Sequence, residues 1–176
     1  PIQRLLSLPE SEKADFAAFS PDGNTIAGVI SNGRITTWTL PDGRKITSMY
    51  RGNDSGFFDV DYSKDGSILA TMPIRGVPNL LKVSDWTQYP FTDHEHTIAL
   101  SYALSPDHRL LAMSRVFFFE RRWSGKNLLW DIEKDQELIT LVLDNDLCNE
   151  MVFSPDGSRI FAAGGFGVIY VYAVPK

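Results

Sequence analysis

A five-residue motif built around a serine and an aspartate occurs four times in this chain and limits its fold more than any other feature. The copies are Phe19-Ser20-Pro21-Asp22-Gly23, Tyr62-Ser63-Lys64-Asp65-Gly66, Leu104-Ser105-Pro106-Asp107-His108 and Phe153-Ser154-Pro155-Asp156-Gly157. Their serines are separated by 43, 42 and 49 residues. Proline presets φ in a turn, and glycine or histidine can follow where the backbone needs unusual angles. Each motif therefore predicts a tight turn that joins two strands.

The residues that follow each turn are also repeated. Two strands are predicted after each turn: Thr25–Ile30 and Arg34–Leu40, Ser67–Thr71 and Asn79–Ser84, Leu110–Ser114 and Asn127–Ile132, and Arg159–Ala163 and Gly167–Val174. Fourth strands rich in β-branched, aromatic and leucine residues are predicted at Lys45–Tyr50, Thr87–Phe91 and Glu137–Leu143. No segment has a helical period over about a dozen residues. A four-stranded repeat of this length predicts an all-β chain of the β-propeller type, with one blade for each repeat.

The third repeat resembles a known family. The segment Asn127-Leu128-Leu129-Trp130-Asp131-Ile132, followed by Glu137-Leu138 and then by the fourth turn motif, is similar to WD repeats of the bacterial type, including their Trp-Asp dipeptide. The resemblance extends from Phe16 to Val174. The matching dipeptides in the other repeats are Trp38-Thr39, Val83-Ser84 and Tyr172-Ala173, and Gly52-Asn53 is the nearest equivalent of the family's Gly-His pair. The resemblance therefore implies a propeller whose hydrogen-bond tetrad of His, Ser or Thr, Asp and Trp is incomplete.

The strand count predicts how such a ring would close. Blades are expected at about 14–50, 57–91, 98–143 and 148–174, and the last blade ends after its third strand. Residues 2–8 form a spare strand, which we expect to pair beside residues 167–174 because closure removes unpaired sheet edges. The chain from 1 to 176 is thus predicted to be a single module of four antiparallel four-stranded blades. Three arrangements stay open: a closed four-blade ring, half of an eight-blade ring, or part of a larger propeller.

Charge and cysteine content argue against several classes of protein. The chain has 17 Lys and Arg against 22 Asp and Glu, a net charge of −5, which disfavours a nucleic-acid or anionic-membrane surface. Cys148 is the single cysteine, so one chain holds neither a disulfide framework nor a Cys-rich zinc site. The first residues lack the apolar core of a secretory signal. We therefore expect a cytoplasmic protein without a nucleic-acid or membrane partner.

Candidate catalytic and metal sites are weak in this sequence. Asp93-His94-Glu95-His96 places two imidazoles beside acidic side chains, but a third strong ligand at a defined spacing is absent. The segment occupies the place of the family's Gly-His pair, so hydrogen bonding within the blade is favoured over metal binding. Neither a Gly-x-Ser-x-Gly elbow nor a phosphate loop before a helix is present. We expect no catalytic residue, metal or cofactor, and a propeller enzyme with its site at the channel mouth is the least favoured alternative.

The largest departure from the repeat is the segment Arg115–Lys126, which lengthens the loop of the third repeat. It combines aromatic residues with arginines, a composition that is favoured at interface hot spots. Phe117 and Phe119 could instead extend the strand and pack between blades. We predict protein-binding residues at Arg121, Arg122 and Trp123 in this segment, with weaker contributors on adjoining loops at His94, His96 and Asn53.

The resemblance implies a non-catalytic scaffold for protein–protein interaction, because members of the family serve as rigid platforms in assemblies. Fold alone does not determine function. The alternative is the sensor portion of a larger bacterial signalling or defence polypeptide, in which the propeller recognises a trigger and an attached effector responds. We expect one or more protein partners. A homodimer that completes an eight-blade ring and a covalent continuation into a longer chain are both open.

Overall fold

The computed structural model describes residues 7, 13–30, 32–50, 56–91, 97–119, 122–141, 148–164 and 167–175. The elements within these ranges are fourteen β-strands, which confirms the predicted all-β class. The described residues form no helix that is long and apolar enough to cross a membrane. The strands form four antiparallel sheets. The chain divides into two compact units, 1–74 with 79–87 and 75–78 with 88–176, which are described separately below.

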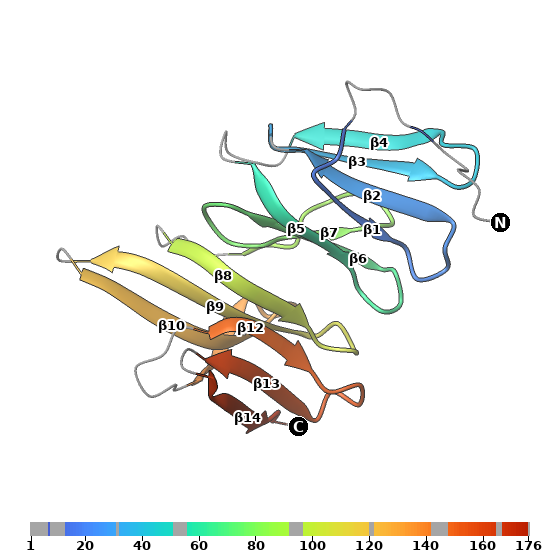
Figure 1. Ribbon diagram of the computed structural model, residues 1–176. Helices are drawn as coiled ribbons and strands as arrows, with labels where there is room; N and C mark the ends of the chain where they lie inside the picture. The colour runs from blue at the N-terminus through green and yellow to red at the C-terminus, as the bar shows by residue number, and fades with distance from the viewer. Residues whose placement is uncertain are drawn as a thin grey trace. The chain divides into compact units, whose positions relative to one another are not determined.

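The first unit contains two sheets (Figure 1). The first sheet has the order β1 (Phe16–Phe19), β2 (Thr25–Ile30), β3 (Arg34–Thr39) and β4 (Lys45–Tyr50). The second sheet has the order β5 (Phe57–Tyr62), β6 (Ile68–Pro73) and β7 (Asn79–Lys82). In both sheets, strands that follow one another in the chain are neighbours in space, as a meander requires.

The second unit repeats this arrangement with its own two sheets. The third sheet has the order β8 (Thr97–Leu104), β9 (Leu110–Phe119), β10 (Arg122–Asp131) and β11 (Gln136–Leu141). The fourth sheet has the order β12 (Cys148–Phe153), β13 (Arg159–Gly164) and β14 (Ile169–Ala173). The fourth sheet thus ends after its third strand, as predicted, and the closing strand expected at residues 2–8 lies outside the described residues.

The four repeated turns share one hydrogen-bond geometry. In each turn the serine hydroxyl donates to the aspartate two residues later, at 2.6, 2.8, 2.6 and 2.5 Å for Ser20, Ser63, Ser105 and Ser154. The same hydroxyl oxygen accepts the backbone N–H five residues later, at the start of the next strand. Gly23, Gly66, His108 and Gly157 have φ values of 70, 76, 60 and 71°. The prediction that glycine or histidine follows each aspartate at an unusual backbone angle is confirmed.

The fourth strand predicted at Thr87–Phe91 in the second sheet is formed only at its start, where the N–H of Lys82 donates to the carbonyl of Thr87 at 2.8 Å and Gln88 forms a single bridge. The turn after β7 resembles the turn before β4: the N–H of Trp86 donates to the carbonyl of Lys82 at 2.8 Å, and Trp86 has a φ of 61°. Pro90 lacks the N–H that a ladder strand would donate. Phe91 stacks its ring on Trp130 of β10, with centroids 4.7 Å apart. The predicted strand is therefore not continued to Phe91.

Within each unit the two sheets pack face to face. In the first unit one buried cluster joins Ala27, Val29 and Ile35 of the first sheet to Tyr62, Leu69 and Leu81 of the second. In the second unit another joins Leu110, Ala112 and Leu129 of the third sheet to Met151, Ile160 and Ala162 of the fourth. One hydrogen bond crosses the second interface, from the N–H of Met151 to the hydroxyl of Ser101 at 2.9 Å. Each unit therefore has its own hydrophobic core.

The turns also meet within each unit. A Cβ added to Gly66 would lie 3.4 Å from Cδ of Pro21, and a Cβ added to Gly157 would lie 3.4 Å from Cδ of Pro106. The proline of one turn thus rests against the glycine of the next turn in both units. This contact brings the ends of successive sheets together in the same way twice.

Gly28 in β2 provides a test of the packing on the first sheet. A Cβ at Gly28 would lie 2.7 Å from Cβ of Ala14 and 2.9 Å from the ring of Trp38, so we expect Gly28→Ala to lower the free energy of unfolding by about 1–3 kcal/mol through overpacking. Adding Ala14→Gly should restore part of this loss. Gly23→Ala is the matched control, because Gly23 has open space around it and a φ of 70°; its loss should be unaffected by Ala14→Gly. Urea unfolding of the variants measures the difference, and equal effects of Ala14→Gly on both would contradict the assigned contact.

Candidate protein-binding site

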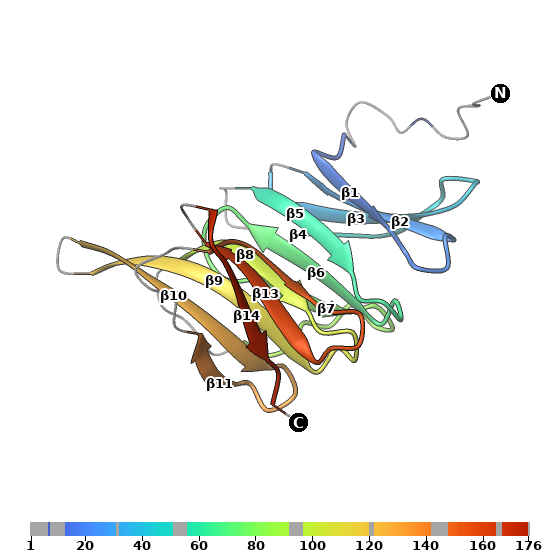
Figure 2. The same cartoon turned by 60° about the horizontal axis from the view of Figure 1, so that its bottom comes forward.

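A ribbon formed by β9 and β10 extends from the third sheet (Figure 2). The two strands are each ten residues long, and their register pairs Phe119 with Arg122 and Phe118 with Trp123. β8 pairs with β9 no further than Phe117, and β11 pairs with β10 no further than Asn127. The residue pairs beyond these points have no third strand in the described part of the sheet. The ribbon tip therefore projects past both neighbouring strands.

The predicted binding residues fall partly on this ribbon. Arg122 and Trp123 begin β10 at its tip, whereas Arg121 lies outside the described residues. The other predicted residues, His94, His96 and Asn53, also lie outside them. Residues 115–126 do not lengthen a loop as expected: the strands continue to Phe119 and resume at Arg122. The run of valine and phenylalanine from Val116 to Phe119 explains this, because such residues favour strands.

An ion pair joins the base of the ribbon to β11. Lys126 in β10 lies 2.5 Å from Glu137 in β11, and Thr140 donates its hydroxyl to the same carboxylate at 2.6 Å. Burial acts to raise the pKa of Glu137, but the hydrogen bonds from Lys126 and Thr140 outweigh it and lower the pKa. Arg115, opposite Lys126 in β9, is 3% exposed. The base of the ribbon is thus held by buried and half-buried charged groups, while its tip carries arginine and tryptophan.

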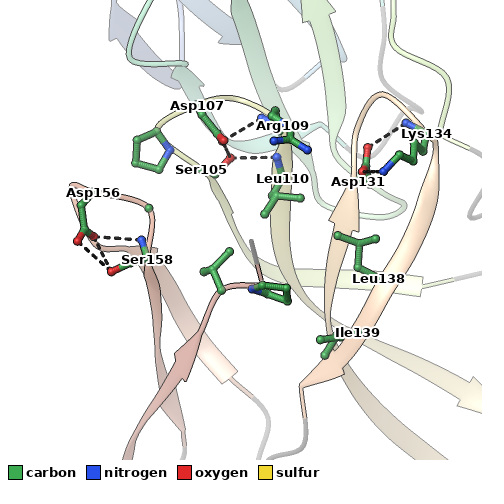
Figure 3. Close-up of a pocket in the computed structure, with 14 residues that line it drawn as sticks. Ser105, Asp107, Arg109, Leu110, Asp131, Lys134, Leu138, Ile139, Asp156 and Ser158 are labelled. Carbon is green, nitrogen blue, oxygen red and sulfur yellow. Dashed lines mark hydrogen bonds and ion pairs between the residues drawn. The ribbon is translucent and has the colours of Figure 1, made fainter.

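A cleft of about 680 Å³ lies at the turn end of the second unit. Figure 3 shows Asp156 and Ser158 on one side, Leu138 and Ile139 of β11 on the other, and Leu110 between them. Val174 and Pro175, which follow β14, complete the lining. Leu138 and Ile139 are 38 and 41% exposed. The cleft therefore offers an apolar surface beside the sheet that has three strands.

Charged side chains from three turns surround this cleft. A hydrogen bond from Ser105 lowers the pKa of Asp107, and the N–H of Lys134 lowers that of Asp131. The Ser154 hydroxyl and the N–H and hydroxyl of Ser158 lower the pKa of Asp156 to about 2. All three carboxylates are therefore ionised at neutral pH. Lys134 also forms an ion pair with Asp131 at 3.1 Å.

The serine–aspartate pairs beside the cleft have a structural role. Ser105 donates its hydroxyl to Asp107, and the same pairing recurs in all four turns, where it closes the turn. A serine nucleophile would need a base that accepts its proton, and the lowered pKa of Asp107 makes this carboxylate a weaker base than an ordinary aspartate. The volume and the mixture of apolar floor and polar rim are typical of ligand clefts.

The sequence does not predict this cleft. The repeated motifs correctly predict that the aspartates lie in turns, whereas the predicted binding residues lie in other segments. One signal was present: Leu138 and Ile139 are adjacent apolar residues on an outer strand, which breaks the apolar–polar alternation expected there. Their meeting with Val174 and the fourth turn depends on the packing of two sheets, which no local pattern reports.

The remaining candidate groups are structural or lie outside the description. Cys148 is fully buried, donates to the carbonyl of Glu150 at 2.9 Å, and has its pKa raised by burial. No group of three His, Cys, Asp or Glu side chains that could hold a metal occurs among the residues whose placement is described. Because His94 and His96 are not among them, the absence of a metal site stays a prediction.

Trp130, the tryptophan of the Trp-Asp dipeptide, is buried, and its indole N–H has no hydrogen-bond partner among the described residues. Asp131 instead accepts the N–H of Lys134 at 3.0 Å and so stabilises the turn after β10. The dipeptide thus contributes packing and a turn at this position.

The comparisons with known proteins are sparse at the sequence level. No family model matches the chain, and no curated protein matches it. Among solved structures it is similar to the "Crystal structure of the computationally designed Ika4 protein", with a TM-score of 0.78 and 16% identity over 99% of this chain and 100% of that chain. At this identity the likeness shows the fold alone.

The lowered pKa of Asp156 predicts a pH-dependent contribution to stability. Because the folded-state pKa lies near 2, below the ordinary value of 3.8, the charged carboxylate stabilises the fold above about pH 4, and this effect is lost as the pH falls toward 2. Asp156→Asn should therefore melt below the wild type at pH 7, with the gap closing near pH 2. Glu133→Gln controls for the removal of one charge and should show no such convergence. A gap for Asp156→Asn that is the same at pH 7 and pH 2 would contradict the assignment.

Proposed function

We propose that this protein is a non-catalytic scaffold that binds another protein, and that the β9–β10 ribbon is its main contact. The observation that carries this proposal is the register of the hairpin, which extends past β8 and β11 with Arg122 and Trp123 at its tip. An isolated two-stranded ribbon gains little stability of its own. A function in recognition explains the extension, because arginine and tryptophan have large effects when they are desolvated at an interface.

The charges of this segment indicate the kind of partner. Residues 115–126 contain Arg115, Arg121, Arg122 and Lys126 against one acid, Glu120, whereas the chain as a whole is acidic. Arg115 and Lys126 belong to the base of the ribbon, and Arg122 lies at its tip. We infer a partner with an acidic surface that includes an apolar pocket for the tryptophan.

The proposed architecture is a β-propeller of WD-repeat type. It is supported by four antiparallel sheets with one turn geometry and by the same face-to-face packing in both units. Residues 2–8 supply the fourth strand of the last sheet, beside β14, where the cleft leaves room next to Leu138 and Ile139. The second candidate function, the sensor of a larger bacterial polypeptide, would use the same ribbon to recognise its trigger.

The ribbon is tested by paired binding and melting measurements. Arg122→Ala with Trp123→Ala should reduce recovery of the partner by more than about tenfold, because truncation of a hot spot costs about 2 kcal/mol or more. Its melting temperature should stay close to that of the wild type. Arg34→Ala with Tyr50→Ala is the matched control, since these residues form an exposed cross-strand arginine–aromatic pair in the first sheet and should not affect binding.

Two results would contradict the proposal. Unchanged recovery from the ribbon variant would exclude the ribbon as the binding site. A loss of stability of roughly 3 kcal/mol or more for Trp123→Ala would assign that side chain to a core instead.

The closing strand is tested by removing residues 1–9. If this segment pairs with β14, the truncated protein should expose an unpaired edge and aggregate at a lower concentration than the full chain. Light scattering over a concentration series measures the change. An unaltered melting point and solubility would show that residues 2–8 do not complete the fourth sheet.

A further inference from the structure

The two faces of each sheet have different roles in packing. In the first unit the row Ala18–Ala27–Thr37 of the first sheet faces the second sheet, and in the second unit the row Ala103–Ala112–Leu129 of the third sheet faces the fourth. The later sheet of each unit presents the opposite kind of row, Tyr62–Leu69–Leu81 or Phe153–Ile160–Tyr172. We call the first kind the forward face of a sheet and the second kind its backward face.

The fourth sheet has an apolar forward face that is open. Val152, Phe161 and Val171 lie directly opposite one another across its three strands. Val152 is 48% exposed and Val171 is 54% exposed, and Ile169 on the same face is 68% exposed. A contiguous apolar surface of this kind on a sheet face indicates an interaction site.

On the backward face of the first sheet, the residue in the first strand, Phe19, is exposed to solvent. Phe19 stands directly before the turn serine, as Tyr62 and Phe153 do in the second and fourth sheets. Tyr62 is 7% exposed because it packs into the core of its unit, whereas Phe19 is 65% exposed. Its row continues through Ile26 to Trp38, which is buried with its ring near Gly28. Phe19 and the partly exposed Ile26 are therefore the open part of this face.

We propose that the forward face of the fourth sheet binds the backward face of the first sheet of a second copy of this chain, so that two copies form a closed head-to-tail pair. The occupant is inferred from the packing rule itself: a forward face meets a backward face in both units, and each copy carries one open face of each kind. Two identical contacts between two copies cover all four open faces, which closes the assembly.

This pairing goes beyond the proposed binding function, since it uses neither the ribbon nor its partner. Self-association and partner binding through the ribbon can therefore be tested separately. A variant that loses self-association can still be measured for partner binding, and a ribbon variant can still be measured for self-association.

The mass in solution is the first test. Light scattering of the purified full chain should give twice the 19.8 kDa of one chain at micromolar concentration and one chain on strong dilution. A single-chain mass at every concentration would overturn the proposal, including the case in which the first and fourth sheets of one chain cover each other. Masses that grow beyond the pair with concentration would overturn the closed arrangement.

Charge substitutions on the two faces identify the contact. Phe19→Lys and Val171→Glu should each shift the mass to that of one chain, because each places a charge in an apolar contact. Both side chains are more than half exposed, so the circular dichroism spectrum should be unchanged. Val152→Glu provides a second variant of the same forward face. Ile46→Lys, at a residue of β4 that is 46% exposed and lies in neither row, is the matched control and should keep the pair.

Mixing the two variants gives the sharpest result. In a head-to-tail pair of one Phe19→Lys chain and one Val171→Glu chain, one contact is unaltered and the other sets lysine against glutamate. The mixture should therefore recover the mass of the pair although neither variant forms it alone. Failure of the mixture to associate, or persistence of the pair in the separate variants, would overturn the assignment of these faces.

Discussion

The hydrogen bonds of the serine–aspartate turn are the interaction on which the rest of this structure depends. Each serine hydroxyl donates to the aspartate and accepts the first N–H of the next strand, so the turn holds the first two strands of its sheet in one register. A shift of one residue would exchange the two faces of the sheet. The turn therefore decides that Ala112 points toward the next sheet and Leu111 away from it. The packing of forward on backward faces follows from this local geometry, repeated four times.

The surfaces that we propose for binding lie where the repeat is interrupted. The aspartates that recur in every turn are committed to closing it, and their lowered pKa values reflect that role. The ribbon, by contrast, occurs in one sheet, and the open faces belong to the first and the fourth sheet. A repeated residue thus maintains the scaffold, while a departure from the repeat offers a surface that other sheets do not cover.

The candidate site could be predicted from the sequence only in part. The length and composition of residues 115–126 indicated the segment, because it breaks an otherwise regular spacing. Whether it was loop or strand was open, since aromatic residues suit both a binding loop and a β-ribbon. The structure shows that the segment is a strand ribbon, since Phe118 of β9 pairs with Trp123 of β10. The cleft beside Leu138 was not predictable in the same way, because its walls come from two sheets.

The sequence by itself determined the strands, the turns and the class of fold, because turn chemistry and apolar alternation act between residues close in the chain. It correctly placed the unusual backbone angle at His108, but it continued a strand as far as Phe91, where Pro90 lacks an N–H and Phe91 stacks on Trp130. Only the tertiary structure decided which apolar residues are buried. Phe19 and Tyr62 occupy the same position in their repeats, yet Phe19 is 65% exposed and Tyr62 is 7% exposed. No local sequence pattern predicts this difference, because burial depends on whether another sheet lies against that face.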